Sequence, residues 1–281
     1  MRSFGLNFCA GALVLFSWSP VRAQQQSALD QIGAIASGSQ CAAKIWNDRG
    51  RAPKAYIHGM AVVFARAVCR SDRADVKVVS SARGAPGSDA DKIDALTWYD
   101  RKFTELGMPN TSGGVDTLRH AYTLLLGLGM RESSGQYCAG RDKSAGFSEA
   151  NSAEAGLFQT SWGASKAHET LPRLYERYKT DQKACLLDVF SRNVSCKLWD
   201  AKTWGKETDE GYNWQKLTKA CPAFATEYGA VVLRTHGGRG PVGEFGPIRA
   251  RAAQVLPECD SMFLQVQKLV QSTLQFCAAV Q

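Results

Sequence analysis

The stretch "LLLGLGMRESSGQYC", Leu124–Cys138, begins as an apolar segment and ends in a charged pair followed by Ser-Ser-Gly. It continues a helical pattern in which a stripe of residues recurs in steps of four and three. The pattern predicts a buried helix whose last turn carries an acid. Gly127 and Gly129 each cost about 1 kcal/mol of helix propensity relative to alanine, so we expect them to admit a neighbouring element or a ligand close to the helix. The stripe consists of Leu118, Tyr122, Leu125, Gly129 and Glu132.

Glu132 is the feature of this helix that most needs an explanation. Burial disfavours the ionised form of a carboxyl and raises its pKa. A carboxylic acid that stays protonated near neutral pH can give its proton to a leaving-group oxygen, as in glycoside cleavage. The alternative is an ordinary role, in which Glu132 is a solvated helix-end residue or pairs with Arg131 or Arg141.

The first 23 residues have the pattern of a secretory signal peptide. They combine a basic start, an apolar run that is too short for a comfortable membrane span, and small residues at Val21 and Ala23. We therefore predict cleavage after Ala23 and an exported protein, periplasmic or extracellular, without a membrane anchor. "QQQS", Gln24–Ser27, is expected to be a frayed end.

The cysteines agree with export. Of the nine in the chain, Cys9 belongs to the predicted signal peptide. An even set of eight in an exported chain indicates up to four disulfides, whose pairing the sequence leaves open. Zinc binding is the alternative, but the chain has neither a C-x-x-C pair nor H-E-x-x-H. We expect no metal and no cofactor. The eight are Cys41, Cys69, Cys138, Cys185, Cys196, Cys221, Cys259 and Cys277.

The rest of the chain predicts a mainly α protein with few short strands. "ADVKVVSSARGAPG", Ala74–Gly87, reads as a strand-like piece followed by a Gly/Pro loop. Residues 24–112 form either a separate helical subdomain or the first helices of one domain that continues through 113–281. From apolar periodicity and stop signals, the other expected helices are Ala52–Cys69, Ser88–Gly107, Ala164–Lys179, Asp181–Phe190, Pro222–Arg234, Pro247–Leu256 and Asp260–Val280.

A second motif follows the central helix by about twenty residues. In "NSAEAGLFQTSWGAS", Asn151–Ser165, a small-residue loop precedes Gly-Leu-Phe-Gln. Together with "RESSG", this resembles the paired motifs of the soluble lytic transglycosylase and goose-type lysozyme group, with Phe158 in place of the usual Met. The resemblance covers roughly Val115 to Gly243. It implies a lysozyme-like helical domain with Glu132 as the catalytic acid. It also implies a sugar cleft lined by Ser133, Gly156, Leu157, Phe158, Gln159 and Trp162.

A third piece, "VVLRTHGGRGPVGEFG" or Val231–Gly246, is similar to the helix end that carries A-Y-N-A-G-x-G in that group. Laid over it, Thr235 takes the Tyr position and His236 the Asn position. Tyr228 is an alternative hydroxyl donor. His236 either hydrogen-bonds near the sugar or is a loop histidine without a role.

Most hydrolases of this kind need a second carboxylate. Where the family carries an Asp, this chain has Ser161. Among Asp142, Glu149 and Glu154 in the loop, Glu149 is the best candidate to replace it, and the alternative for each is a solvent-facing acid. A lytic transglycosylase needs only the single acid, since the substrate's own 6-hydroxyl attacks.

These observations predict an exported enzyme that cuts peptidoglycan glycan strands between N-acetylmuramic acid and N-acetylglucosamine, with lytic transglycosylation favoured. The alternatives are a hydrolytic muramidase or chitin-type glycosidase, and a wall-binding protein of the same fold without catalysis. The net charge of +8, or +6 once Arg2 and Arg22 leave with the signal peptide, suits an acidic polymer. A nucleic-acid partner is not expected outside the cytoplasm, and nothing in the sequence indicates an oligomeric state.

Overall fold

The computed structural model describes residues 20–141, 149–196, 202–240, 244–272 and 274–280. Residues 1–19 of the predicted signal peptide and Asp142 lie outside this part of the chain. The described chain is mainly helical, as expected, with one two-stranded antiparallel sheet that pairs Ile45 with Arg51. Within it, no helix combines the length and the apolar character needed to cross a membrane.

The elements of the first half are α1 (Pro20–Gly38), α2 (Gln40–Ala43), β1 (Ile45–Trp46), β2 (Gly50–Arg51), α3 (Lys54–Cys69), α4 (Ala74–Ser80), α5 (Ala90–Ile93), α6 (Ala95–Trp98), α7 (Asp100–Glu105) and α8 (Val115–Ser133). Those of the second half are the 3-10 helices η1 (Ala150–Ser152), η2 (Trp162–Ala167) and η3 (Gln182–Cys185), and the α-helices α9 (Thr170–Thr180), α10 (Leu187–Phe190), α11 (Glu210–Ala220), α12 (Pro222–Thr235), α13 (Gly246–Arg249), α14 (Pro257–Ser272) and α15 (Leu274–Val280).

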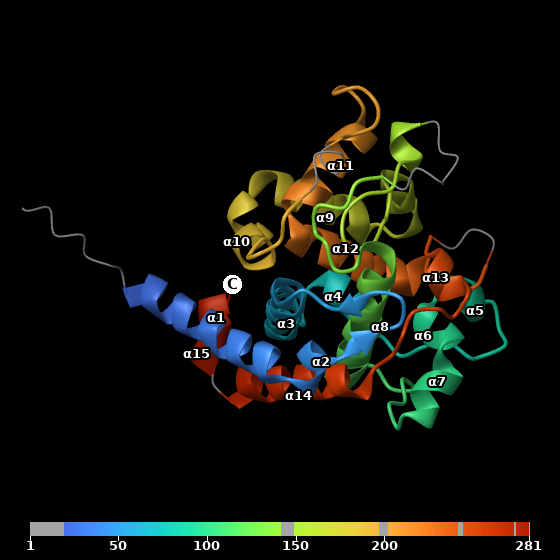
Figure 1. The fold of residues 1–281 in the computed structure, drawn as a ribbon. Coiled ribbons are helices and arrows are strands. Elements are labelled where there is room, and N and C mark those ends of the chain that lie inside the picture. The colour runs from blue at the N-terminus through green and yellow to red at the C-terminus, as the bar shows by residue number, and fades with distance from the viewer. Residues whose placement is uncertain (1–19, 142–148, 197–201, 241–243, 273, 281) are drawn as a thin grey trace, which may run out of the picture.

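Helix α8 lies at the centre of the molecule (Figure 1). It contacts α3, α4, α12, α13 and α14, and every residue from Thr117 to Met130 is buried. The predicted stripe is buried up to Gly129, and Glu132 is half-buried. A helix that is apolar around most of its circumference needs neighbours on all sides, and these five helices provide them.

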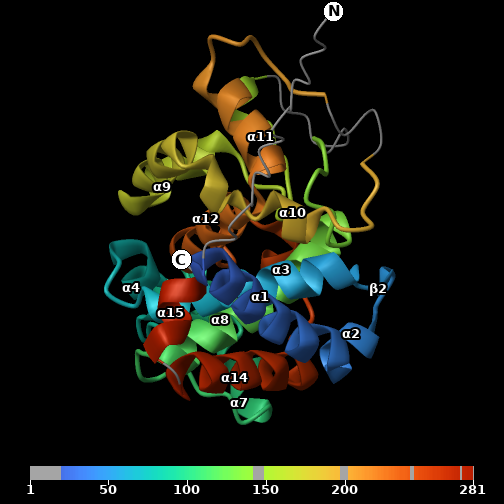
Figure 2. The same ribbon diagram turned by 90° about the vertical axis from the view of Figure 1, so that its left-hand side faces the viewer.

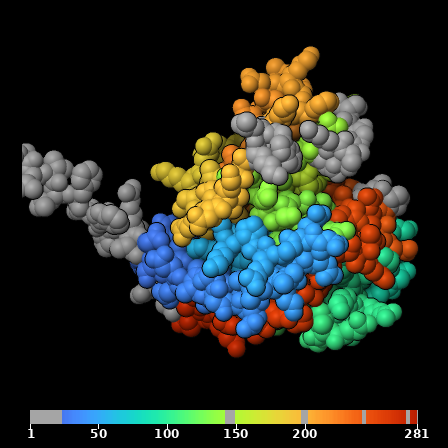
Figure 3. All heavy atoms as spheres, viewed as in Figure 1, coloured from blue at the N-terminus to red at the C-terminus, as the bar shows by residue number. Residues whose placement is uncertain are grey.

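The N-terminal helices and the C-terminal helices share one hydrophobic core. Helix α1 packs on α3, α14 and α15, which Figure 2 shows on one side of the molecule. The disulfides Cys41–Cys259 and Cys69–Cys277 join these two ends of the chain. Helices α9, α11 and α12 form the opposite part, from which the segment around α11 projects in Figure 3.

All eight expected cysteines are paired, which confirms the disulfide prediction. The other two pairs are Cys138–Cys196 and Cys185–Cys221. Cys138 follows the end of α8 by five residues, so its disulfide ties the segment that leaves α8 to residue 196.

The predictions for residues 74–107 are partly wrong. Ala74–Ser80 forms helix α4 instead of a strand, because Val76 and Val79, three positions apart, are buried on one helical face. Residues 88–107 form three short helices instead of one. Asp94 breaks the first from the second: its carboxylate accepts from the Leu96 N–H at 3.0 Å and from Arg234 Nε at 2.7 Å.

Four further segments differ from the sequence-based prediction. The expected Ala164–Lys179 helix is divided into η2 and α9 at His168, whose backbone is extended. Gln24–Ser27 is helical within α1 instead of frayed. Leu186 has a left-handed backbone, with φ of 55°, and divides the expected Asp181–Phe190 helix into η3 and α10. The expected helix over 247–256 ends at Arg249, and Arg251, with φ of 53°, turns the chain into an irregular segment. Helix α11 is not among the helices expected from the sequence.

Candidate active site

Helix α8 ends as predicted, in the Ser-Ser-Gly turn. Ser134 and Gly135 both have a left-handed backbone, with φ of 55° and 73°. The Gly135 N–H donates to the Gly129 carbonyl at 3.1 Å, and the Ser134 N–H donates to the Met130 carbonyl at 3.1 Å. These two bonds satisfy carbonyls of the last turn of the helix. It fixes Glu132 in the final turn.

Ser133 joins the first motif to the second. Its hydroxyl lies 2.8 Å from the Leu157 carbonyl and 3.0 Å from the Gly129 carbonyl. Leu157 belongs to a tight turn closed by a bridge between Ala155 and Thr160. The two motifs, separated in sequence by about twenty residues, are therefore in direct contact beside Glu132.

Phe158 explains the glycines of α8 and α12. A Cβ on Gly129 would lie 2.9 Å from the Phe158 ring and 2.2 Å from the Tyr56 hydroxyl, and a Cβ on Gly229 would lie 2.9 Å from the same ring. The close approach expected at Gly129 is thus that of aromatic side chains. Leu157 and Phe158 are no more than 1 % exposed. They were predicted to line the sugar cleft, but they have no surface to offer a ligand and instead support the turn from within the core.

Two other predicted cleft residues have protein partners. The turn has a left-handed backbone at Gly156 and Gln159, with φ of 78° and 47°. The Gln159 side-chain amide donates to the Gly156 carbonyl at 3.0 Å, so this side chain closes its own turn. Trp162 is half-buried, and its ring centroid lies 4.9 Å from that of Tyr175.

Helix α12, whose end carries the third motif, contacts the second motif through Tyr228. The hydroxyl of Tyr228, on α12, donates to the Ser161 carbonyl at 3.1 Å. The structure therefore places Tyr228 beside the second motif, whereas Thr235 donates its hydroxyl back to the Val231 carbonyl of its own helix at 2.9 Å. Of the two candidate hydroxyls, Tyr228 is the one that joins the motifs.

Glu244 is the residue of this site that sequence reasoning missed. Its side chain is only 12 % exposed, and its Oε2 lies 4.0 Å from His236 Nε2. The Ser161 hydroxyl and N–H both donate to its carboxylate. Burial, the dominant influence, nevertheless raises the pKa of Glu244 to about 7. Burial, together with the positive charge of Arg249, lowers the pKa of His236, so the imidazole is neutral near pH 7.

Glu244 and Ser161 lie 83 positions apart in the sequence. Local sequence patterns could therefore not predict their contact. The only signal was an acid within a Gly-rich segment that follows a buried helix. Glu149, the predicted second acid, is exposed and precedes η1. The buried carboxyl of Glu244 therefore lies against Ser161, the position at which the resemblance implies an Asp.

The two acids are connected through the second motif. Ser133, the neighbour of Glu132 in sequence, donates to the Leu157 carbonyl. Ser161, which follows this turn, donates to the carboxylate of Glu244. A buried carboxyl whose pKa lies near 7 can exchange a proton at neutral pH, a property that clusters at functional sites. Within the described residues, no three His, Cys, Asp or Glu side chains come together as a metal site.

Comparison with known proteins gave no match: no protein-family model, no curated protein and no solved structure that was searched matches the chain.

Proposed function

We propose that the protein is an exported enzyme of lysozyme-like fold that cuts the β-1,4 bond between N-acetylmuramic acid and N-acetylglucosamine in peptidoglycan. The observation that carries the proposal is the 2.8 Å bond from Ser133 to the Leu157 carbonyl. It brings the E-S pair and the G-L-F-Q turn together, as their resemblance to the transglycosylase and goose-type lysozyme motifs requires. The proposal rests on this contact and on the half-buried position of Glu132.

In the proposed reaction, Glu132 first donates its proton to the bridging oxygen as the C1–O bond breaks. The N-acetyl carbonyl of the substrate stabilises the cation at C1. The Glu132 carboxylate then takes the proton of the 6-hydroxyl of the same sugar, whose oxygen attacks C1 and closes a 1,6-anhydro ring. This lytic transglycosylation needs a single acid and no added water.

Glu244 favours a second candidate, hydrolysis. A second carboxylate can act as a base that activates water on the other face of the sugar. Glu244 is a buried carboxyl whose pKa of about 7 suits that task, and its hydrogen bonds to Ser161 fix its orientation. Glu149, which is exposed, has no such support.

The test is release of soluble muropeptides from purified sacculi by wild type and Glu132→Gln, with the exposed acid variant Glu149→Gln as the matched control. Loss of general acid catalysis costs about 100- to 10,000-fold in rate. We expect that loss for Glu132→Gln, with unchanged thermal unfolding, and near wild-type release for Glu149→Gln. Equal turnover in Glu132→Gln and wild type would refute the proposal.

Mass spectrometry of the products separates the candidates. Anhydro ends identify transglycosylation, and reducing ends identify hydrolysis. Sacculus binding without any soluble product would instead indicate a wall-binding protein that lacks catalysis.

A further inference from the structure

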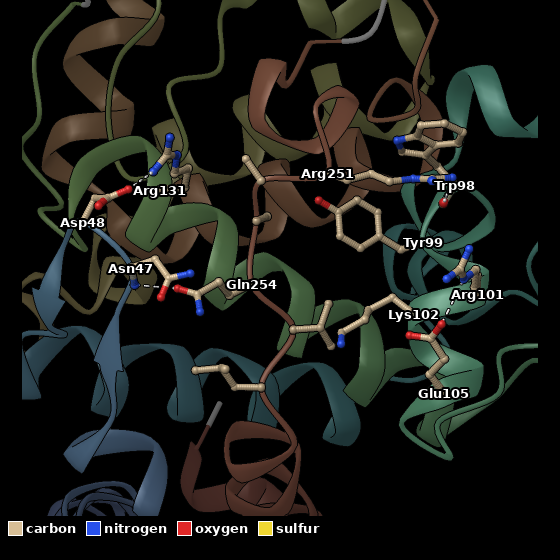
Figure 4. Close-up of a pocket in the computed structure, with 14 residues that line it drawn as sticks. Asn47, Asp48, Trp98, Tyr99, Arg101, Lys102, Glu105, Arg131, Arg251 and Gln254 are labelled. Atoms are coloured by element: carbon tan, nitrogen blue, oxygen red, sulfur yellow. Dashed lines mark hydrogen bonds and ion pairs between the residues drawn. The ribbon is translucent and has the colours of Figure 1, made fainter.

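A groove of about 770 Å³ opens beside the C-terminal end of α8 (Figure 4). The β1–β2 turn and Arg131 form one wall, the segment from Trp98 to Glu105 forms the other, and residues 251–256 form the floor. Glu132 does not line it. Arg131 and Ser133 are about 200° apart around the helix, so the groove and the Leu157 turn lie on different sides of the helix end that bears Glu132.

The groove carries an excess of positive charge. Four cationic side chains line it, against the two acids Asp48 and Glu105, for a net charge of +2 (4 − 2). The acids pair with Arg131 at 3.4 Å and Arg101 at 2.9 Å, in exposed contacts that water and ligands can replace at little cost. In the described part of the chain, Lys102 and Arg251 form no ion pair, and Figure 4 shows the Lys102 amine directed into the groove. The cationic residues are Arg101, Lys102, Arg131 and Arg251.

Arg251 is held in place by a strained turn. Its φ of 53° lies in the left-handed region, which is strained for a residue with a side chain. Its guanidinium lies 3.5 Å from the centroid of the Trp98 ring, and it donates to the Trp98 carbonyl at 3.3 Å. The Trp98 indole in turn donates to the Ile248 carbonyl at 3.1 Å. Backbone strain that the surrounding structure maintains is a feature of binding sites.

The floor of the groove is also fixed. The Gln254 side-chain oxygen accepts from the Asn47 N–H at 2.7 Å, which ties the floor to the β1–β2 turn. A Cβ on Gly127 would lie 2.0 Å from the Gln254 carbonyl oxygen, so this glycine lets the floor rest directly on α8. The cationic side chains therefore stand on a preformed surface, which lowers the cost of binding.

We propose that this groove binds a short acidic peptide through at least two of its carboxylates. Guanidinium groups bind carboxylates through two parallel hydrogen bonds, and ammonium groups through a point charge. The ring of Trp98 is covered by Arg251, and that of Tyr99 is buried, so the lining offers cations, not open aromatic faces for sugar stacking. The acidic stem peptides of peptidoglycan have this chemistry. That identification rests on the proposed function, because it takes the glycan of those stems to lie at Glu132.

The test is calorimetric titration of the whole protein with the synthetic peptide N-acetyl-Ala-γ-Glu-Lys-Ala-Ala, whose two carboxylates outnumber its one amine, with free carboxylates or with the same groups amidated. We expect the free peptide to bind, amidation to weaken binding at least tenfold, and the double variant Lys102→Gln/Arg251→Gln to do the same. Lys268→Gln, which removes one positive charge from an exposed lysine on α14, is the control for charge loss outside the groove and should bind as wild type. Binding should also weaken as salt rises.

Equal binding of the free and amidated peptides, or equal binding by the double variant and Lys268→Gln, would overturn the proposal. If inorganic phosphate displaced the peptide at similar concentrations, the groove would bind anions without specificity. That result would also overturn the proposal. Because Lys102 is exposed, Lys102→Gln alone keeps the test valid if Arg251→Gln does not fold. Cleavage of a peptide-free glycan by wild type tests the proposed function separately, and Glu132→Gln should leave peptide binding unchanged.

Discussion

The two residues that flank Glu132 belong to regions of opposite character. Ser133 bonds to the Leu157 turn, behind which lie Ser161, Tyr228 and the buried carboxyl of Glu244. Arg131 lines an open, cationic groove whose ion pairs are exposed. The buried side can tune a pKa, because it excludes water, and the open side can attract charge without altering it much.

This difference suggests a division of labour around one helix end. We assign proton transfer to the buried side and recognition of an acidic ligand to the open side. Changes on the buried side should alter pH dependence and stability, whereas changes on the open side should alter binding and salt dependence.

Glu244→Gln is the strongest test of the buried side. The pKa of Glu244 is raised from 4.5 to about 7 on folding. Its contribution to the free energy of unfolding is therefore fully present below pH 4.5 and is lost as pH rises through 7. In this range the carboxyl ionises readily in the unfolded chain, whereas the buried native carboxyl resists ionisation. Gln removes this loss. We compare the difference in free energy of unfolding, variant minus wild type, at two pH values. We expect this difference to be ~3 kcal/mol larger at pH 7.5 than at pH 4.5.

Urea unfolding at the two pH values measures this difference. The control is Glu149→Gln, which makes the same substitution at an exposed side chain. If the Glu244→Gln difference does not change with pH more than that of the control, the carboxyl is not held in a desolvated site and the contrast between the two sides fails.

Gly127→Ala tests the floor of the groove. The added Cβ would meet the Gln254 backbone oxygen at 2.0 Å, and a backbone atom cannot move aside cheaply. Overpacking of this kind costs 1–3 kcal/mol, less about 1 kcal/mol gained in helix propensity. We expect a net destabilisation of up to about 2 kcal/mol, with weaker binding of the acidic peptide, measured by urea unfolding and calorimetry. Unchanged stability would mean that the floor does not rest on α8.

The end of α8 could be predicted from the sequence, because periodicity and turn chemistry act over a few residues. A place for the second motif near this helix end was implied only by the resemblance. The groove and Glu244 could not be predicted. Glu244 depends on Ser161, 83 positions away, and the break in the expected Ser88–Gly107 helix depends on an ion pair between Asp94 and Arg234. The valines of α4 illustrate the same limit, since their strand propensity is overridden by burial on a helical face.

Ser133→Ala tests the link between the motifs. The hydroxyl donates to the Leu157 and Gly129 carbonyls, and its removal leaves the Leu157 carbonyl without this donor. We expect a loss of about 1 kcal/mol in unfolding free energy and a larger fall in muropeptide release, since the turn would no longer be fixed beside Glu132. Ser152→Ala is a suitable control, because that hydroxyl donates only to the local Glu149 carbonyl. Equal effects of the two substitutions would argue against a special role for the contact.

The smallest expected effect concerns Arg251, where stability and binding should oppose each other. Both Arg251→Gly and Arg251→Gln remove the guanidinium from Trp98, but only glycine adopts φ of 53° without strain. We expect the glycine variant to be more stable than the glutamine variant by up to about 1 kcal/mol in urea unfolding, while both lose affinity for the acidic peptide. A glutamine variant as stable as the glycine variant would show that the turn stores no strain. The Arg251 guanidinium would then be placed by its contact with Trp98 alone.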